Sequence, residues 1–178
     1  MKFNFNKYLF FIFLFTVVVN CVYSQGDQFV FAKNKTKGVY IYQFAKNVFW
    51  PINHGNGDFI IGIYGDKEFF KQFNNSYTGK LIGSQKIKIK YYNELNNITE
   101  SHLFFVSQEK TRNINEVSKM LPTHTLLVSE GQDLVTTGSI INFIYVQSRL
   151  KFQVNKTKAE KNDLKIGQQL QKLAHSTI

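Results

Sequence analysis

Three short apolar segments constrain the fold of this chain most strongly. They are Phe59–Tyr64, Leu103–Val106 and Thr125–Val128, each bounded by polar residues. Uninterrupted apolar runs of this length are typical of strands that are buried on both faces of a sheet. A helix predicted around Asn113 to Leu121 separates the last two strands, and such a crossover indicates that they run parallel. The sequence therefore predicts an α/β fold.

The segment before the first of these strands has apolar residues at helical spacing. It extends from Phe29 to Phe49, and Trp50-Pro51 ends it because Pro disfavours helical geometry in the residue before it. The intervals of three to four residues predict that the helix buries one face. This face consists of Val39, Tyr42, Ala45 and Phe49.

The remaining segments complete the predicted fold. A helix over Lys67–Phe73 turns Phe69, Phe70 and Phe73 inward, and the alternation of Ile87, Ile89 and Tyr91 with lysines predicts a half-exposed strand at a sheet edge. Near the C-terminus we expect a hairpin of Ser139–Val146 and Arg149–Val154, followed by a helix over Leu164–His175. Together these elements predict a single α/β domain: a mixed, mostly parallel sheet flanked by helices, Rossmann-like and in three layers, with a C-terminal β-hairpin and helix.

The first 24 residues have the order of a secretory signal peptide. Lys2 and Lys7 precede the apolar run Tyr8–Val19, and Ser24 provides a small residue before a cleavage point. Twelve helical residues span about 18 Å, well short of the roughly 30 Å hydrocarbon core, so no stable membrane anchor is expected after cleavage. We expect residues 1–24 to be removed, which leaves residues 25–178 as an exported, periplasmic domain. The alternatives are an uncleaved signal anchor and a lipoprotein modified at Cys21.

Charge and cysteine content narrow the function. The chain has 22 Lys plus Arg against 12 Asp plus Glu, a net charge of +10 that falls to +8 when Lys2 and Lys7 are removed. The lysines are scattered along the chain, so we expect no nucleic-acid partner. A solvated lysine face, or attraction to an anionic membrane surface or envelope polymer, explains the charge better. Cys21 is the only cysteine, so the mature chain can form no disulfide.

No catalytic or cofactor motif is present. The sequence lacks the phosphate-binding glycine motifs, the G-x-S-x-G elbow and the H-E-x-x-H zinc motif. We therefore predict no enzyme, no catalytic residues, no cofactor and no metal. His102 and His124 stand in matching frames at the starts of two predicted strands, where they could share a metal, but no third ligand is evident.

Segments over most of the mature chain resemble the YfiR family of exported bacterial regulators, a domain of unknown function. The similar segments lie between Lys37 and Ala174: Gly38–Pro51, Phe59–Gly65, Ser101–Ser107, Thr125–Ser129, Gly138–Phe143, Arg149–Asn155 and Leu164–Ala174. The resemblance implies a periplasmic protein that restrains a membrane diguanylate cyclase by binding its exported sensor domain. Cyclic-di-GMP output and biofilm formation would then respond to envelope conditions.

Two positions depart from the family pattern. Ser101 stands where many members have Cys, so a redox response based on disulfides cannot operate here, and Ser139 replaces the second Gly of a Gly-Gly pair. Trp50-Pro51, Asn142 and Asn155 match the family. Their expected roles are structural: Trp50 packs over the sheet, and Asn155 caps the helix after the last strand.

Three hypotheses follow. The first is a signalling regulator whose partner is an inner-membrane diguanylate cyclase or histidine kinase. The second is a periplasmic small-ligand-binding protein in which Tyr40, Phe44 and Trp50 line a pocket rather than pack in the core. The third is a hydrolase with a dispersed site. The sequence leaves the oligomeric state open, a homodimer included.

Overall fold

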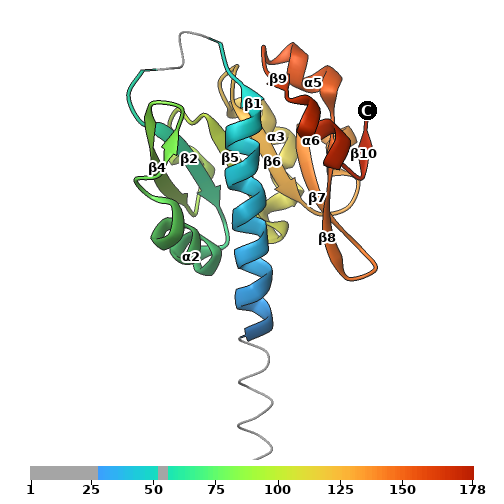
Figure 1. Ribbon diagram of the computed structural model, residues 1–178, viewed down its shortest axis with the longest axis horizontal. Helices are drawn as coiled ribbons and strands as arrows, with labels where there is room; N and C mark the ends of the chain where they lie inside the picture. The colour runs from blue at the N-terminus through green and yellow to red at the C-terminus, as the bar shows by residue number, and fades with distance from the viewer. Residues whose placement is uncertain (1–27, 52–55) are drawn as a thin grey trace, which may run out of the picture.

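The computed structural model describes residues 28–51 and 56–178, which form a single α/β domain (Figure 1). The signal peptide expected over residues 1–24 lies outside the described residues. The first described element is a helix over residues 28–47, the N-terminal helix, which lies across one face of the sheet. None of the helices in the described ranges combines the length and the apolar character that a membrane span needs.

The other elements follow in chain order. The strands are β1 (Val48–Phe49), β2 (Phe59–Tyr64), β3 (Leu81–Ile82), β4 (Gln85–Tyr92), β5 (Leu103–Val106), β6 (Leu126–Glu130), β7 (Ile141–Val146), β8 (Arg149–Val154), β9 (Lys165–Ile166) and β10 (Ser176–Thr177). The α-helices are α2 (Lys67–Tyr77), α3 (Ile114–Met120), α4 (Leu134–Thr137), α5 (Lys156–Lys161) and α6 (Gln168–Leu173). Two 3-10 helices are η2 (Leu95–Asn97) and η3 (Gln108–Asn113).

The main sheet of the described residues has the order β10-β8-β7-β6-β5-β2-β4-β3. Strands β4, β2, β5, β6 and β7 pair in parallel, whereas β3 with β4 and β7 with β8 are antiparallel. Strand β10 also pairs with β8 in parallel, and the sheet is mixed, as predicted. The short β3 and the β7–β8 hairpin introduce antiparallel pairs on both sides, because tight turns join antiparallel neighbours.

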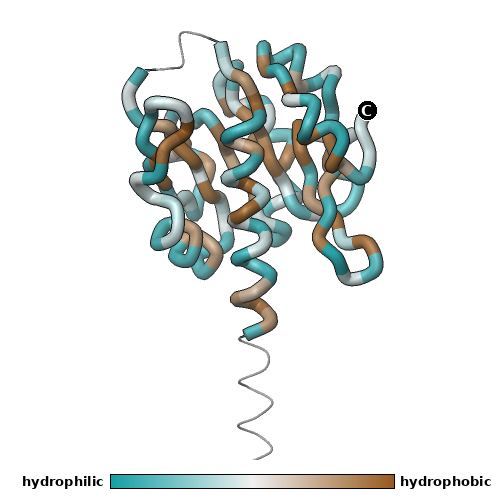
Figure 2. The backbone as a smooth tube through the Cα atoms, viewed as in Figure 1, coloured by the Kyte–Doolittle hydropathy of each residue, from teal (hydrophilic) through white to brown (hydrophobic). Residues whose placement is uncertain are grey.

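Buried side chains fill both faces of the sheet. Alternate residues of a strand point to opposite faces, so Leu103 and Phe105 belong to one core cluster and Phe104 and Val106 to the other. The N-terminal helix, α2, α5 and α6 contribute to the first cluster, and α3 to the second. Figure 2 shows hydrophobic residues gathered on the central strands. The helices therefore cover both faces, while a Rossmann-like classification stays a prediction.

The buried face of the N-terminal helix overlaps only in part with the predicted one: Ala45 is buried and Tyr42 packs against the core, as predicted. Val39 and Phe49 are exposed, and the residues turned to the sheet are Asn34, Lys37, Gly38, Ile41, Phe44, Ala45 and Val48. The helix also ends at residue 47, because Val48–Phe49 pairs with Lys165–Ile166 as a two-stranded antiparallel sheet. The prediction was wrong for Val39 and Phe49 because two of the inward positions, Asn34 and Lys37, are polar and do not add to the apolar pattern of the sequence.

The C-terminal segment is also more divided than predicted. Instead of one helix over Leu164–His175, it contains β9, the short helix α6 and β10. Strand β9 forms through its long-range pairing with β1, and the Gly167 N–H donates to the carbonyl of Asn47 at 2.8 Å. The helix that follows β8 is α5, which begins at Lys156; its N-cap is Asn155, whose side chain accepts a hydrogen bond from the Lys158 N–H at 2.7 Å. The predicted capping role of Asn155 is confirmed.

Candidate functional site

A polar cleft of about 910 Å³ opens at the carboxyl ends of the parallel strands. We name it the carboxyl-edge cleft. The chain leaves β2 toward β4 on one side and continues with β5 on the other, so the strand order reverses between β2 and β5. In open α/β sheets, the crevice at such a reversal is where ligands bind. The cleft is lined by Val30, Lys33, Asn34, Lys37, Gly65, Asp66, Lys67, Glu68, Tyr91, Asn93, Ser107, Gln108, Glu109, Lys110 and Glu130.

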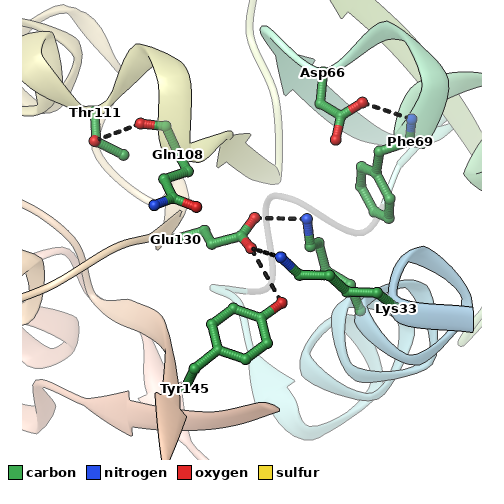
Figure 3. A network of polar contacts seen from close by, with 8 residues as sticks. Lys33, Asp66, Phe69, Gln108, Thr111, Glu130 and Tyr145 are labelled. Carbon is green, nitrogen blue, oxygen red and sulfur yellow. Dashed lines mark hydrogen bonds and ion pairs between the residues drawn. The ribbon is translucent and has the colours of Figure 1, made fainter. Parts of the chain in front are cut away.

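Glu130, the last residue of β6, holds the charged centre of this cleft (Figure 3). Its Oε2 lies 2.5 Å from the Nζ of Lys37, and its Oε1 lies 3.7 Å from the Nζ of Lys33. The Tyr145 hydroxyl donates a hydrogen bond to the same Oε1 at 3.3 Å. One carboxylate thereby connects the N-terminal helix, β6 and β7.

The Lys37 ammonium group is enclosed by aromatic rings as well as by the carboxylate. Its Nζ lies 5.1 Å from the ring centroid of Phe69 and 5.4 Å from that of Phe105. The Nζ of Lys33 lies 4.3 Å from the ring centroid of Tyr145. Cation–π attraction at such distances partly offsets the loss of hydration of a buried ammonium group. The aromatic residues of α2, β5 and β7 therefore make this buried charge cluster tolerable.

Burial and charge shift several pKa values, but at separate places. Burial raises the pKa of the Tyr145 phenol, and the neighbouring Glu130 carboxylate raises it further. Burial also raises the pKa of Tyr64 and Tyr77, and it lowers the pKa of Lys158. Tyr77, Tyr145 and Lys158 line three different hollows. These shifts therefore do not mark one acid–base centre.

A second buried polar network lies behind the cleft. The Oγ of Ser129 lies 2.8 Å from the Oγ of Ser139 and 2.8 Å from the Oδ1 of Asn142. The Asn142 amide donates to the Gly131 carbonyl at 2.8 Å, and the Ser139 hydroxyl donates to the Leu134 carbonyl at 2.9 Å. The hydroxyl of Ser139 therefore joins the Ser129 side chain to the backbone ahead of β7.

His102 and His124 have structural surroundings. Pairing of Leu103 with Leu126 shifts the two strands by one residue relative to the matching frames. The Nδ1 of His102 accepts a hydrogen bond from the Ile60 N–H at 3.0 Å, and the Nδ1 of His124 lies 3.6 Å from the Asp163 carboxylate. Among residues 28–51 and 56–178, no three His, Cys, Asp or Glu side chains lie close enough together to hold a metal ion.

The aromatic residues considered for a ligand pocket belong to the core. Phe44 is buried and lies 5.4 Å from Phe143, centroid to centroid, and Tyr40 lies 5.6 Å from Phe152. The indole of Trp50 meets Phe59 edge-on at 5.1 Å, as expected for packing over the sheet. The core-packing interpretation therefore holds for all three.

Sequence reasoning missed the charged centre of the cleft. In the sequence, Lys37 is one of several scattered lysines, and Glu130 lies just beyond the predicted strand Thr125–Val128. A charged residue on the inward face of a helix and an acid at the end of a buried strand could have indicated a buried pair, because buried charges need partners.

The fold and the cleft define a single α/β domain with a charge-balanced cleft at the carboxyl edge of its sheet. Residues 34–175 match the family described as DUF4154, YfiR/HmsC-like, and the chain belongs to this family. Its members are generally periplasmic regulators of cyclic-di-GMP signalling rather than enzymes. No curated protein sequence matches the chain.

Proposed function

We propose that this protein is an exported regulator that binds and restrains the periplasmic sensor domain of an inner-membrane diguanylate cyclase or histidine kinase. The observation that carries the proposal is the family match over residues 34–175. Removal of residues 1–24 and release into the periplasm are part of it, in keeping with the family's usual location. Cyclic-di-GMP level and biofilm formation would be the cellular outputs.

An exposed surface on the N-terminal helix supports partner binding. Phe31, Lys35 and Val39 are exposed at intervals of four residues, and so share one side of the helix. With Lys80 and Leu81 at and beside β3, we call these residues the basic apolar face. A hollow of about 500 Å³ between the helix and α2 is lined by Phe31, Lys35, Val39 and Lys80. Exposed large apolar side chains grouped in this way are typical of interaction surfaces.

The charges on this face indicate the chemistry of the partner. Lys35 and Lys80 flank the apolar side chains, and the Nζ of Lys80 lies 4.5 Å from the ring centroid of Tyr77. A complementary surface would offer apolar side chains surrounded by Asp and Glu. We therefore infer that the partner's sensor domain presents an acidic rim.

Restraint would act through a shift of population. A regulator that binds only the inactive arrangement of a sensor domain stabilises that arrangement by its binding free energy. Release of the regulator then allows the active arrangement to form. This mechanism requires no catalytic reaction by the regulator, in keeping with a family of regulators.

The experiment is a direct binding measurement with designed variants. The purified protein is titrated with the periplasmic domains of membrane cyclases and kinases from the same cells. We expect one of them to bind, and Val39→Asp to weaken that binding about tenfold or more, because a charge would then be buried at the contact. Met120→Asp is the matched control, since Met120 is 46% exposed against 45% for Val39 and lies on α3, on the opposite face of the sheet.

The cellular measurement uses the same pair of variants. Val39→Asp should raise cyclic-di-GMP or kinase output as a gene deletion does, whereas Met120→Asp should leave it at the wild-type level. Equal effects of the two substitutions would show that the partner does not bind through the basic apolar face. A deletion that changes neither output nor biofilm would overturn the proposal itself.

A further inference from the structure

The turns that follow β2 and β5 meet inside the carboxyl-edge cleft. Gly65 follows β2 and Ser107 follows β5, and the Ser107 N–H donates to the Tyr64 carbonyl at 3.0 Å. Gly65 has φ +105°, and a Cβ placed on it would lie 2.1 Å from the Ser107 Oγ. The glycine therefore leaves room for the serine hydroxyl at the point where the strand order reverses.

The Ser107 hydroxyl is buried and has no hydrogen-bond partner among the described residues. Ser107 is 3% exposed and lines the cleft. It precedes η3, yet its side chain makes no capping bond to that helix. Buried hydroxyl groups in folded proteins are nearly always paired, since an unpaired one loses its bonds to water without replacement. A ligand atom that accepts a hydrogen bond would supply the partner.

The N-terminus of α2 lies in the same cleft. Asp66 caps this eleven-residue helix by accepting the Phe69 N–H at 2.8 Å. Lys67 and Glu68 also line the cleft, and N–H groups this early in a helix have no acceptor within the helix. Such N–H groups and the positive end of the helix dipole favour an anion.

The charges that line the carboxyl-edge cleft are equal in number: Lys33, Lys37, Lys67 and Lys110 against Asp66, Glu68, Glu109 and Glu130. Glu130 forms ion pairs with Lys37 and Lys33. The Oε1 of Glu68 lies 2.7 Å from the Nζ of Lys71, a lysine that does not line the cleft. Among the described residues no ion pair engages Lys67 or Lys110, and Asp66 and Glu109 are the acids that remain beside them. The Asp66 carboxylate keeps its charge while it accepts the capping bond. Lys67 and Lys110 are therefore the cationic groups that an anion at the turns after β2 and β5 would meet.

We propose that the carboxyl-edge cleft binds a small molecule through an oxyanion, either a carboxylate or a phosphate. The Ser107 hydroxyl donates to the oxyanion, and Lys110 and the N-terminus of α2 balance its charge. At about 910 Å³, the cleft matches sites for organic ligands rather than for a bare ion. The regulator would thereby have an input site for a small metabolite. This site shares no residue with the basic apolar face, so it can be tested apart from partner binding.

The test measures thermal unfolding and calorimetric binding of the purified protein with inorganic phosphate and with succinate, at constant ionic strength set by sodium chloride. We expect at least one of the two anions to raise the Tm saturably, with one site per chain. A response to phosphate alone assigns a phosphate group, and a response to succinate alone assigns a carboxylate. Sodium chloride alone should produce no saturable shift.

Three variants separate this site from others. Ser107→Ala and Lys110→Gln should each weaken anion binding about tenfold, because each removes a hydrogen bond or charge directed at the anion. Lys46→Gln, a lysine outside the cleft lining, should bind as the wild type does. Without ligand, Ser107→Ala should be at least as stable as the wild type, because it removes an unpaired buried hydroxyl group.

Three results would overturn the proposal. The first is the absence of a saturable shift with either anion. The second is a shift that Ser107→Ala and Lys110→Gln retain in full, which would place the anion elsewhere on the basic surface. The third is a loss of stability in ligand-free Ser107→Ala, which would show that the hydroxyl already has a partner in the folded protein.

Discussion

The Nζ of Lys37 lies 2.5 Å from the Oε2 of Glu130, and the two side chains are 3% and 4% exposed. Lys37 belongs to the N-terminal helix and Glu130 ends β6, so this ion pair fixes the helix to the sheet at the edge where the cleft opens. A buried pair of this kind adds little stability compared with apolar residues of the same size. Loss of one partner, however, leaves the other charge buried and unpaired.

Lys37→Met should therefore destabilise the protein strongly. The Glu130 carboxylate would keep only the more distant and partly exposed Lys33 as a cationic partner. We expect a loss of about 3–5 kcal/mol in the free energy of unfolding, measured by urea denaturation.

The double variant Lys37→Met/Glu130→Leu should recover most of that loss, because it removes both charges together. Lys71→Met is the control: its partner Glu68 is exposed, so the change should stay below about 1 kcal/mol. A loss in Lys37→Met no larger than in Lys71→Met would contradict the importance of the buried pair.

The Tyr145 phenol predicts a dependence of stability on alkaline pH. Burial and the Glu130 carboxylate raise its pKa in the folded protein, whereas in the unfolded chain the phenol titrates near pH 10. Above about pH 10 the unfolded state loses this proton first, so the stabilising contribution present at lower pH declines as the pH rises.

The urea midpoint of the wild type should thus fall between about pH 9 and pH 11, and it should fall less in Tyr145→Phe. Some decline should remain in the variant, because burial raises the pKa of Tyr64 and Tyr77 as well. Identical pH profiles of the two proteins would show that Tyr145 does not contribute.

The strands of the sheet could be predicted because their signal is local. Phe59–Tyr64 and Leu103–Val106 are apolar throughout, and the structure places strands at both. The hairpin around Gln147-Ser148 was equally predictable, and both residues have positive φ, of 49° and 62°, as a tight hairpin turn requires. Patterns that depend on neighbouring residues alone are visible in the sequence.

The cleft could not be predicted because its determinants are distant in the chain. Lys37 can be buried because Glu130, at the end of β6, pairs with it. The spacing of apolar residues along the sequence does not reveal this pairing. The same holds for Val48–Phe49. In the sequence these residues continue the helical pattern, but in the structure they form a strand because they pair with Lys165–Ile166. Tertiary contacts thus override helical spacing where partners come from far along the chain.

Ser139→Ala tests the buried network behind the cleft. The substitution removes the hydroxyl that lies 2.8 Å from the Ser129 Oγ and donates to the Leu134 carbonyl. We expect a loss of about 0.5–1.5 kcal/mol, because hydrogen bonds are lost while the Ser129 hydroxyl keeps the Asn142 Oδ1 and the Leu134 carbonyl keeps the Gly138 N–H. Ser84→Ala, at an exposed turn, should change the stability by less than about 0.5 kcal/mol. Equal stability of both variants would show that the network relaxes without cost.

Trp50→Phe tests how the strand starts are joined to the end of the N-terminal helix. The indole N–H of Trp50 points at two carbonyl groups, 2.9 Å from that of His124 and 3.3 Å from that of His102. Phe retains an aromatic ring against Phe59 but donates no hydrogen bond, so we expect a loss of about 1–3 kcal/mol. The measurement uses circular dichroism during urea denaturation, because the variant lacks the only tryptophan. His124 has φ +74°, a conformation that its surroundings must hold in place. An unchanged midpoint would therefore mean that packing alone holds this backbone.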